Sequence, residues 1–145
     1  MATAIHRYNT TIKRIVNQDI DLSGCKVMLL NNSVSFDATD VTLVDVAGAD
    51  YVNEVHGNGW DEGGVALTNL RGEVAATNGA MLDADDLEVV ATGGPIGPAY
   101  FAVVYDQNEA PLYLIDFDGA KTADESSPFK IVWSSLGITR FTQAA

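Results

Sequence analysis

Short apolar runs, each closed by turn-forming residues, restrict the fold of this chain more than any other feature. They recur at fairly regular intervals from Cys25 onward: CKVMLLNNS, YVNEVHG, GVALTNLRGEV, LEVVATGG, AYFAVVYD, PLYLIDFDG and FKIVWSS. Runs of this length, bounded by Gly, Asn, Asp and Ser, are typical of β-strands. The pattern predicts an all-β fold of about seven strands, as a compact antiparallel β-sandwich or a flattened barrel.

Two neighbouring runs predict a hairpin. Only the polar connector QNEA separates AYFAVVYD from PLYLIDF, so we expect these strands to pair antiparallel. In FKIVW, residues 129–133, large apolar side chains alternate with Lys130 and Val132, which places one face of that strand in the core. The central runs are apolar on both faces, so a second sheet or a partner must cover them.

One segment inside the β region has helical spacing instead. In ATDVTLVDVAG, residues 38–48, three apolar residues share one face of a helical turn. These are Leu43, Val46 and Ala47. Gly48 is placed to end the turn. We expect at most one short helix.

The N-terminal segment differs from the rest of the chain in charge and in spacing. Its charged residues are Arg7, Lys13 and Arg14, and the first acidic residue is Asp19. Between residues 5 and 16 apolar positions recur three and four apart, as on one helix face, although three poor helix formers follow Tyr8. We predict an N-terminal arm over residues 1–18, helical at best in part, before a single β-sandwich domain over residues 19–145.

Two placements of this arm are open. It can fold onto its own domain, or it can dock on a neighbouring subunit through apolar anchors and basic side chains that meet acidic surface. The anchoring residues would be Ile5, Tyr8 and Ile12, with Arg7, Lys13 and Arg14 as the basic group. For a docking arm, deleting residues 2–17 is expected to leave the sandwich folded and to weaken binding.

The charge balance disfavours several partners. Eight Lys and Arg against 20 Asp and Glu give a formal net charge of -12, which opposes attraction to nucleic acid or to anionic lipid. No apolar stretch has the length of a membrane span or the form of a signal peptide, so we expect a protein made in the cytoplasm. The only cysteine, Cys25, allows no internal disulfide, and we expect it to be a buried apolar thiol.

The glycine-rich stretch HGNGWDEGG, residues 56–64, invites comparison with a phosphate-binding loop. Such a loop ends in Lys and Ser or Thr, whereas Asp61 and Glu62 would repel a phosphate. The spacing of a dinucleotide-binding turn also fails, because its third glycine would fall on Glu62. We therefore expect a wide turn between two strands. In that turn Trp60 either covers the end of the core or anchors an interface.

No metal or catalytic pattern is recognisable. The acidic stretch DADDLE lacks the EF-hand signature, because its sixth and twelfth positions are Glu88 and Gly94. His6 and His56 have no metal-ligand spacing and form no evident triad with Cys25 or a serine. We expect no cofactor, no metal and no enzymatic activity. A carboxylate pair of the glycosidase kind stays open, since its separation is visible only in three dimensions.

One stretch has an unusual order: ATGGPIGPAYFAVVYD joins a glycine pair, a second Gly-Pro and an aromatic-rich strand ending in Tyr-Asp. With CKVMLLNNS, VTLVDVAG, NEVHGNGWDEGGVALTN, PLYLIDFD and FKIVWSSLGITRFT, it covers most of residues 25–142. In these stretches the chain resembles small virion structural proteins of tailed bacteriophages, several of which are regarded as capsid decoration or cement proteins. The N-terminal segment is not part of the resemblance.

The resemblance implies a role in binding. It implies a decoration protein on the outside of the head that stabilises contacts between major capsid subunits, and we expect a homo-oligomer, a trimer, engaging several subunits at once. Two alternatives are a tail or neck structural protein and a carbohydrate-binding module on the virion surface. The second alternative depends on exposed aromatic side chains, for which the candidates are Trp60 and Tyr51.

Overall fold

The computed structural model describes residues 4–74, 79–135 and 137–142. Antiparallel sheets dominate the described residues, which confirms the all-β prediction, and these sheets stay open and form no closed barrel. The elements in chain order are β1 (Ala4–Arg7), α1 (Asn9–Val16), β2 (Lys26–Leu30), α2 (Leu43–Ala47), β3 (Glu54–Val55), β4 (Val65–Ala66), β5 (Arg71–Val74), β6 (Gly79–Asp83), β7 (Leu87–Val90), β8 (Ile96–Tyr105), β9 (Pro111–Ala123), β10 (Pro128–Ile131) and β11 (Thr139–Thr142), with short 3-10 turns at Leu22–Gly24 and Ala49–Tyr51.

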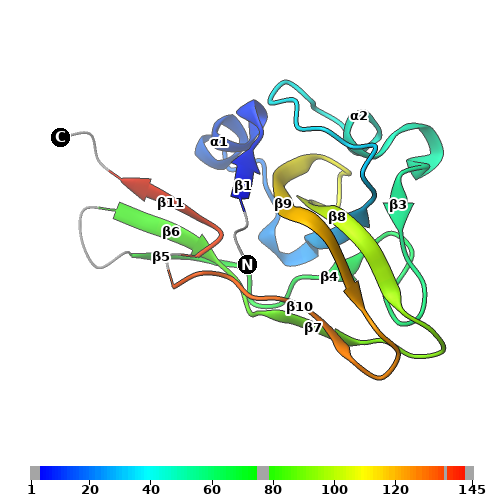
Figure 1. The fold of residues 1–145 in the computed structure, drawn as a ribbon. Coiled ribbons are helices and arrows are strands. Elements are labelled where there is room, and N and C mark those ends of the chain that lie inside the picture. Colours follow the sequence, from blue (N-terminus) through cyan, green and yellow to red (C-terminus); the bar gives the residue numbers. More distant parts are fainter. Residues whose placement is uncertain (1–3, 75–78, 136, 143–145) are drawn as a thin grey trace.

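The main sheet is built around the predicted hairpin. Strands β8 and β9 pair antiparallel from Ile96 opposite Ala123 to Tyr105 opposite Pro111, so the hairpin prediction is confirmed. The strand order is β1-β9-β8-β2-β3, with β4 also paired to β2, so β3 and β4 lie end to end along one edge of β2. Figure 1 shows the two long strands crossing the centre of the molecule.

Each face of the main sheet carries its own layer. Along β2, Val27 and Leu29 belong to one buried cluster, whereas Met28 and Leu30 belong to the other. The first cluster includes β7 and β10, and the second includes α2 and the loop before it (Figure 1). Elements of this chain therefore cover both apolar faces, as the central runs required.

The strand pair β7 and β10 has the predicted alternation. Phe129, Ile131 and Trp133 are buried, while Val132 is 66% exposed. The Phe129 ring meets Phe117 of the main sheet edge to face, with 6.1 Å between ring centroids. This aromatic contact joins the two layers of the sandwich.

Helix α2 confirms the prediction for residues 38–48. The Thr42 side chain accepts a hydrogen bond from Asp45 N–H (3.2 Å), and the Asp45 carboxylate accepts one from Thr42 N–H (3.0 Å). This capping box satisfies backbone groups at the first turn. Gly48 follows the helix at φ +84°. The three apolar residues predicted to share a face, Leu43, Val46 and Ala47, are buried.

The described residues also form a helix α1, whereas at most one short helix was predicted. Residues 9–11 are poor helix formers, yet the helix begins at Asn9. Packing explains the difference, because Thr11 is fully buried and its hydroxyl donates to Leu112 C=O (2.8 Å). The tertiary contact outweighs the weak local propensity.

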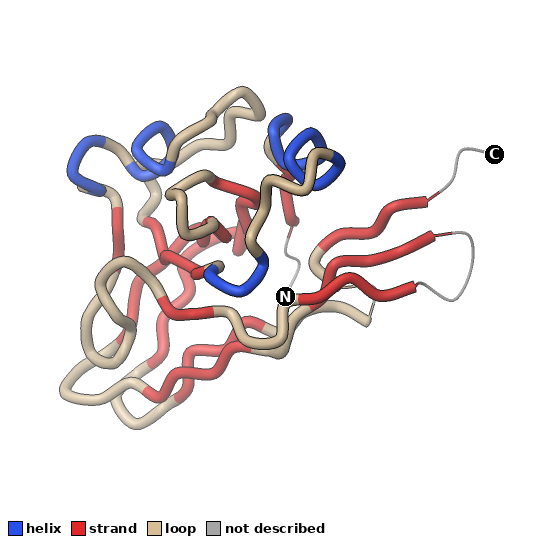
Figure 2. Tube along the Cα trace, turned by 180° about the vertical axis from the view of Figure 1, so that it is seen from behind, coloured by secondary structure: helices blue, strands red, loops and turns tan. Residues whose placement is uncertain are grey.

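The third sheet stands apart from the other two. Strands β5, β6 and β11, in the order β11-β6-β5, form a three-stranded sheet that we call the wing. Both views show it projecting sideways from the main sheet (Figures 1 and 2). At its base, Leu82 and Ile138 belong to the first buried cluster, and the Ile138 N–H donates to Leu82 C=O (2.7 Å) within the wing.

Candidate binding surface

The N-terminal residues belong to the main sheet. Strand β1 pairs with β9, with Ile5 opposite Ile115, and Tyr8 is completely buried beside Phe36. Burial raises the pKa of the Tyr8 hydroxyl, and the nearby carboxylate of Asp40 adds to the effect. Of the two placements left open for the N-terminal segment, residues 4–16 have the first: they fold onto their own domain. Residues 1–3, 75–78, 136 and 143–145 of the predicted units lie outside the described residues.

The buried position of Tyr8 has a physical reason. Alternate side chains of a strand that pairs with β9 must point toward a buried layer. The Tyr8 side chain packs in the buried layer that contains α2. Tyr8 is therefore not an anchor for a neighbour. Deleting residues 2–17 would remove an edge strand and a core aromatic, so we now expect this deletion to destabilise the sandwich.

The basic side chains of this segment have different surroundings. Arg14 forms an ion pair with Asp106, whose side chain is fully buried, so its charge is satisfied within the molecule. The guanidinium of Arg7 lies 5.8 Å from the ring centroid of Phe141 in the wing, and the Arg7 residue is exposed. Lys13 is exposed, and Ile12 and Ile5 are half-buried. Of the predicted contact residues, Ile5, Arg7, Ile12 and Lys13 therefore stay at least partly accessible.

Trp60 belongs to the core. Its side chain is 1% exposed, and its ring meets Phe129 edge to face with 5.4 Å between centroids. Gly57 and Trp60 exchange backbone hydrogen bonds of 2.8 and 3.2 Å, which closes the loop and turns the indole inward. Of the two alternatives for Trp60, the lid over the core is correct and the exposed anchor is wrong.

The same loop offers a test of its glycines. Gly64 has φ +99°, and a Cβ there would lie 2.5 Å from Val27 C=O. Gly57 has φ +107°, but a Cβ there would meet no atom within 4 Å. We expect Gly64→Ala to lower the free energy of unfolding by about 2 to 3 kcal/mol and Gly57→Ala by about 1 kcal/mol. Urea unfolding measures both, and equal losses would contradict a role for the close approach.

Two residues considered as candidates for chemistry, His6 and Cys25, have packing roles in the described part of the chain. Among the described residues, no group of three or more His, Cys, Asp or Glu side chains could hold a metal ion. His6 stacks on Phe36 with 4.8 Å between ring centroids, so it has a packing role. Cys25 is 1% exposed, and burial raises the pKa of its thiol to about 11, which keeps it protonated at neutral pH. No helix in the described part of the chain has the length and hydropathy needed to cross a bilayer.

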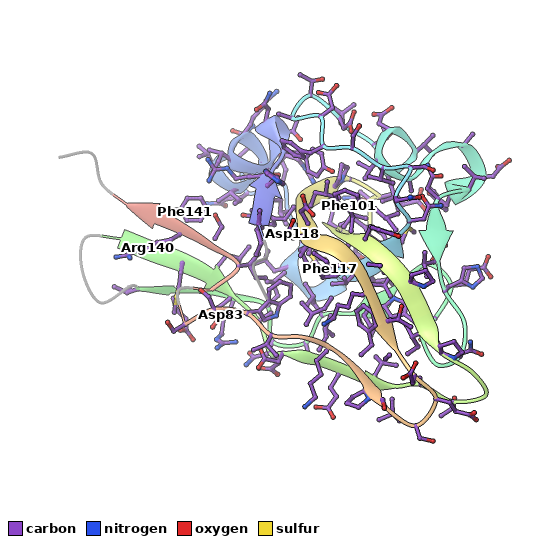
Figure 3. The ribbon with its side chains drawn as sticks, in the orientation of Figure 1. Asp83, Phe101, Phe117, Asp118, Arg140 and Phe141 are labelled. Atoms are coloured by element: carbon purple, nitrogen blue, oxygen red, sulfur yellow. The ribbon has the colours of Figure 1, made fainter. Side chains whose placement is uncertain are left out.

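The wing has one charged face and one apolar face. Arg71 reaches the carboxylates of Glu73 (2.5 Å) and Asp83 (3.4 Å) on the first face. Consecutive residues of a strand point to opposite faces, so Arg140 lies on the charged face and Phe141 on the apolar one (Figure 3). Side chains on the apolar face include Val74, Ala80, Leu82 and Phe141.

Much of this apolar face is open to solvent. Leu82 is buried at the base of the wing, whereas Val74 is 88% exposed. Strands β5 and β11 are the outer strands, and neither has a hydrogen-bonded neighbour on its outer edge within the described residues. Unpaired edges beside exposed apolar side chains are features that other chains can recognise.

A hollow of about 650 Å³ opens between the main sheet and the base of the wing. Its apolar lining includes Ile5, Ile115, Phe117, Ile131, Trp133 and Ile138. Lys121, Lys130 and Arg140 are the charged residues among its lining, and no acidic residue is among the described ones. We call it the main hollow. No local pattern in the sequence could have revealed it, because strands far apart in the chain supply its residues.

Comparisons with family models, with curated proteins and with solved structures find no match to this chain. Its function is therefore inferred from the exposed surfaces of the molecule.

Proposed function

We propose that the protein is a non-enzymatic bacteriophage virion protein, a capsid decoration protein that binds the outside of the head and stabilises contacts between major capsid subunits. The observation that carries the proposal is the wing. It exposes apolar side chains such as Val74 on a sheet whose outer edges are unpaired in the described residues. When another protein covers a projecting sheet of this kind, exposed apolar surface is removed from water and the free energy of the system falls. Most of residues 25–142 resembles small virion structural proteins of tailed bacteriophages, several of which are regarded as decoration proteins, and on this ground we propose the major capsid protein as the partner.

The proposed mechanism shifts the equilibrium between free capsid subunits and the assembled lattice. A protein that binds only the assembled lattice stabilises that lattice by the free energy of its own binding. A homo-oligomer, proposed here as a trimer, would engage several capsid subunits at once and multiply modest contacts. The net charge of -12 disfavours nucleic acid as the partner.

Copy number per particle tests the proposal. Quantitative mass spectrometry of purified virions and of isolated heads should find the protein in the heads, at a simple fraction of the number of major capsid subunits. A few copies confined to tails or necks would contradict a decoration role and favour the tail or neck alternative. The burial of Trp60 removes the indole that motivated a carbohydrate-binding module, and Tyr51 is only partly exposed.

A further inference from the structure

Strand β1 lies between two hollows at an edge of the main sheet. We propose that this edge binds an extended acidic segment of a partner protein, which adds to the main sheet as a further strand. The inference rests on the proposed binding role and names the chemistry of the partner segment.

The outer edge of β1 has backbone N–H and C=O groups that do not bond to β9. On one side β1 pairs with β9, and on the other it has no hydrogen-bonded strand among the described residues. Tyr8 N–H donates to Leu112 C=O (3.3 Å), which continues the ladder past the end of the strand. Pairing alternates along an antiparallel ladder, so the N–H and C=O groups of Ile5 and Arg7 face outward. An added strand would bond to these groups.

A hollow on each face of the sheet provides room for side chains of the added strand. The main hollow lies on the face to which Ile5 points, against Ile115 and Trp133. A second hollow of about 560 Å³ is lined by His6, Tyr8, Ile12 and Phe36, among others, on the opposite face. Successive side chains of a strand point to opposite faces, so a segment along β1 would place them alternately in the two hollows.

The basic charge around the edge favours an acidic segment. Asp and Glu outnumber Lys and Arg by 20 to 8 in the chain, yet no acidic residue is among the described residues that line either hollow. Arg7 is exposed beside the edge, and the Lys121 ammonium lies 5.2 Å from the Phe129 ring centroid. Lys130 is already paired with Glu88 (3.6 Å) and adds little.

The nearest acidic residue of the ladder does not reverse this charge. Asp116 lies opposite Ala4 at the start of β1, and its carboxylate accepts a hydrogen bond from Asp118 N–H (2.9 Å). The carboxylates of Asp37 and Asp40 act on Tyr8 at the second hollow. The basic charge therefore belongs to the side of the main hollow, near Arg7 and Lys121. This arrangement fits a segment in which acidic and apolar residues alternate, with the acidic ones on the side of the main hollow.

A fluorescein-labelled peptide of alternating Asp and Val (DVDVDV) is the probe, titrated with the full chain and followed by fluorescence anisotropy. We expect saturable binding that weakens as ionic strength rises. The matched peptide SVSVSV should bind about tenfold more weakly, because it lacks the carboxylates. A DVDVDV peptide methylated on every backbone nitrogen should not bind, because it cannot donate hydrogen bonds to β1.

Two pairs of protein variants locate the site. Arg7→Pro removes an outward N–H and should weaken DVDVDV binding about tenfold relative to Arg7→Ala, which loses the same charge but keeps the N–H. Lys121→Gln should weaken it several-fold, whereas Lys26→Gln, on the far strand β2, should not. Thermal melting checks that each variant is folded. The methylated peptide tests the same hydrogen bonds on the unaltered protein if Arg7→Pro does not fold.

The proposal is overturned if DVDVDV shows no saturable binding, if SVSVSV or the methylated peptide binds equally well, or if Arg7→Pro binds as tightly as Arg7→Ala. It is also overturned if Arg7→Pro dissociates an oligomer of this chain, because the occupant of the edge would then be a second copy. The titration contains no capsid. If the protein is found on the head but does not bind the peptide, only this inference is rejected. If it binds the peptide but is absent from the head, only the decoration role is rejected.

Discussion

Replacing Arg14 by Met is expected to lower the free energy of unfolding by about 3 to 5 kcal/mol, because it leaves the buried carboxylate of Asp106 without its partner. The Asp106 side chain is fully buried, and the Arg14 side chain is 16% exposed. The Asp106 carboxylate also accepts hydrogen bonds from Asn108 N–H (3.0 Å) and Ala110 N–H (3.1 Å), which hold the turn between β8 and β9. The ion pair therefore ties α1 to the central hairpin.

Urea denaturation of matched variants measures this effect. Lys13 is the neighbouring basic residue on α1 and is exposed, so Lys13→Met should change the stability by less than about 0.5 kcal/mol. The double variant Arg14→Met with Asp106→Asn should lose less than the sum of the single losses, because no unpaired charge remains. Equal stability of Arg14→Met and Lys13→Met would show that the pair does not hold the helix in place.

Replacing Trp60 by Ala is expected to lower the free energy of unfolding by about 3 to 5 kcal/mol, because it removes the largest fully buried side chain among the described residues. The edge-to-face contact with Phe129 would be lost together with the packing between the glycine loop and β10. Urea denaturation followed by circular dichroism measures the loss without relying on the removed indole. Val52→Ala, at a residue that is 72% exposed, is the control and should lie within about 0.5 kcal/mol of the parent.

A second variant separates packing from hydrogen bonding. The indole N–H of Trp60 is buried and has no hydrogen-bond acceptor in the described part of the chain. Trp60→Phe keeps most of the apolar volume and loses no hydrogen bond, so it should cost less than about 2 kcal/mol. A loss for Trp60→Phe as large as that for Trp60→Ala would contradict this account, as would a loss for Trp60→Ala no larger than that for Val52→Ala.

Patterns within a few residues predicted much of the fold. The connector QNEA predicted the hairpin of β8 and β9, and the alternation in residues 129–133 predicted the buried face of β10. The helix over Leu43–Ala47 was visible from its apolar spacing and its terminal Gly48. In each case the backbone hydrogen bonds and the turn geometry are local, so the signal lies in adjacent residues.

The N-terminal segment shows where local patterns were insufficient. Its spacing suggested an arm, and three poor helix formers argued against a full helix. The contacts that decide its structure are distant: Thr11 bonds to Leu112, and Arg14 pairs with Asp106. Neither partner can be recognised from the segment itself. Trp60 is similar, because its burial depends on Phe129.

The sequence by itself determined the class of fold, the positions of most strands and turns, and an acidic chain with a single, buried thiol. Strand periodicity, turn chemistry and charge are properties of neighbouring residues or of composition. Only the tertiary structure decided that Tyr8 and Trp60 are core residues, that β5, β6 and β11 form a projecting wing, and that an edge strand runs between two hollows. These features depend on which distant strands pair, and pairing follows the burial of whole sheet faces, which no short stretch of sequence contains.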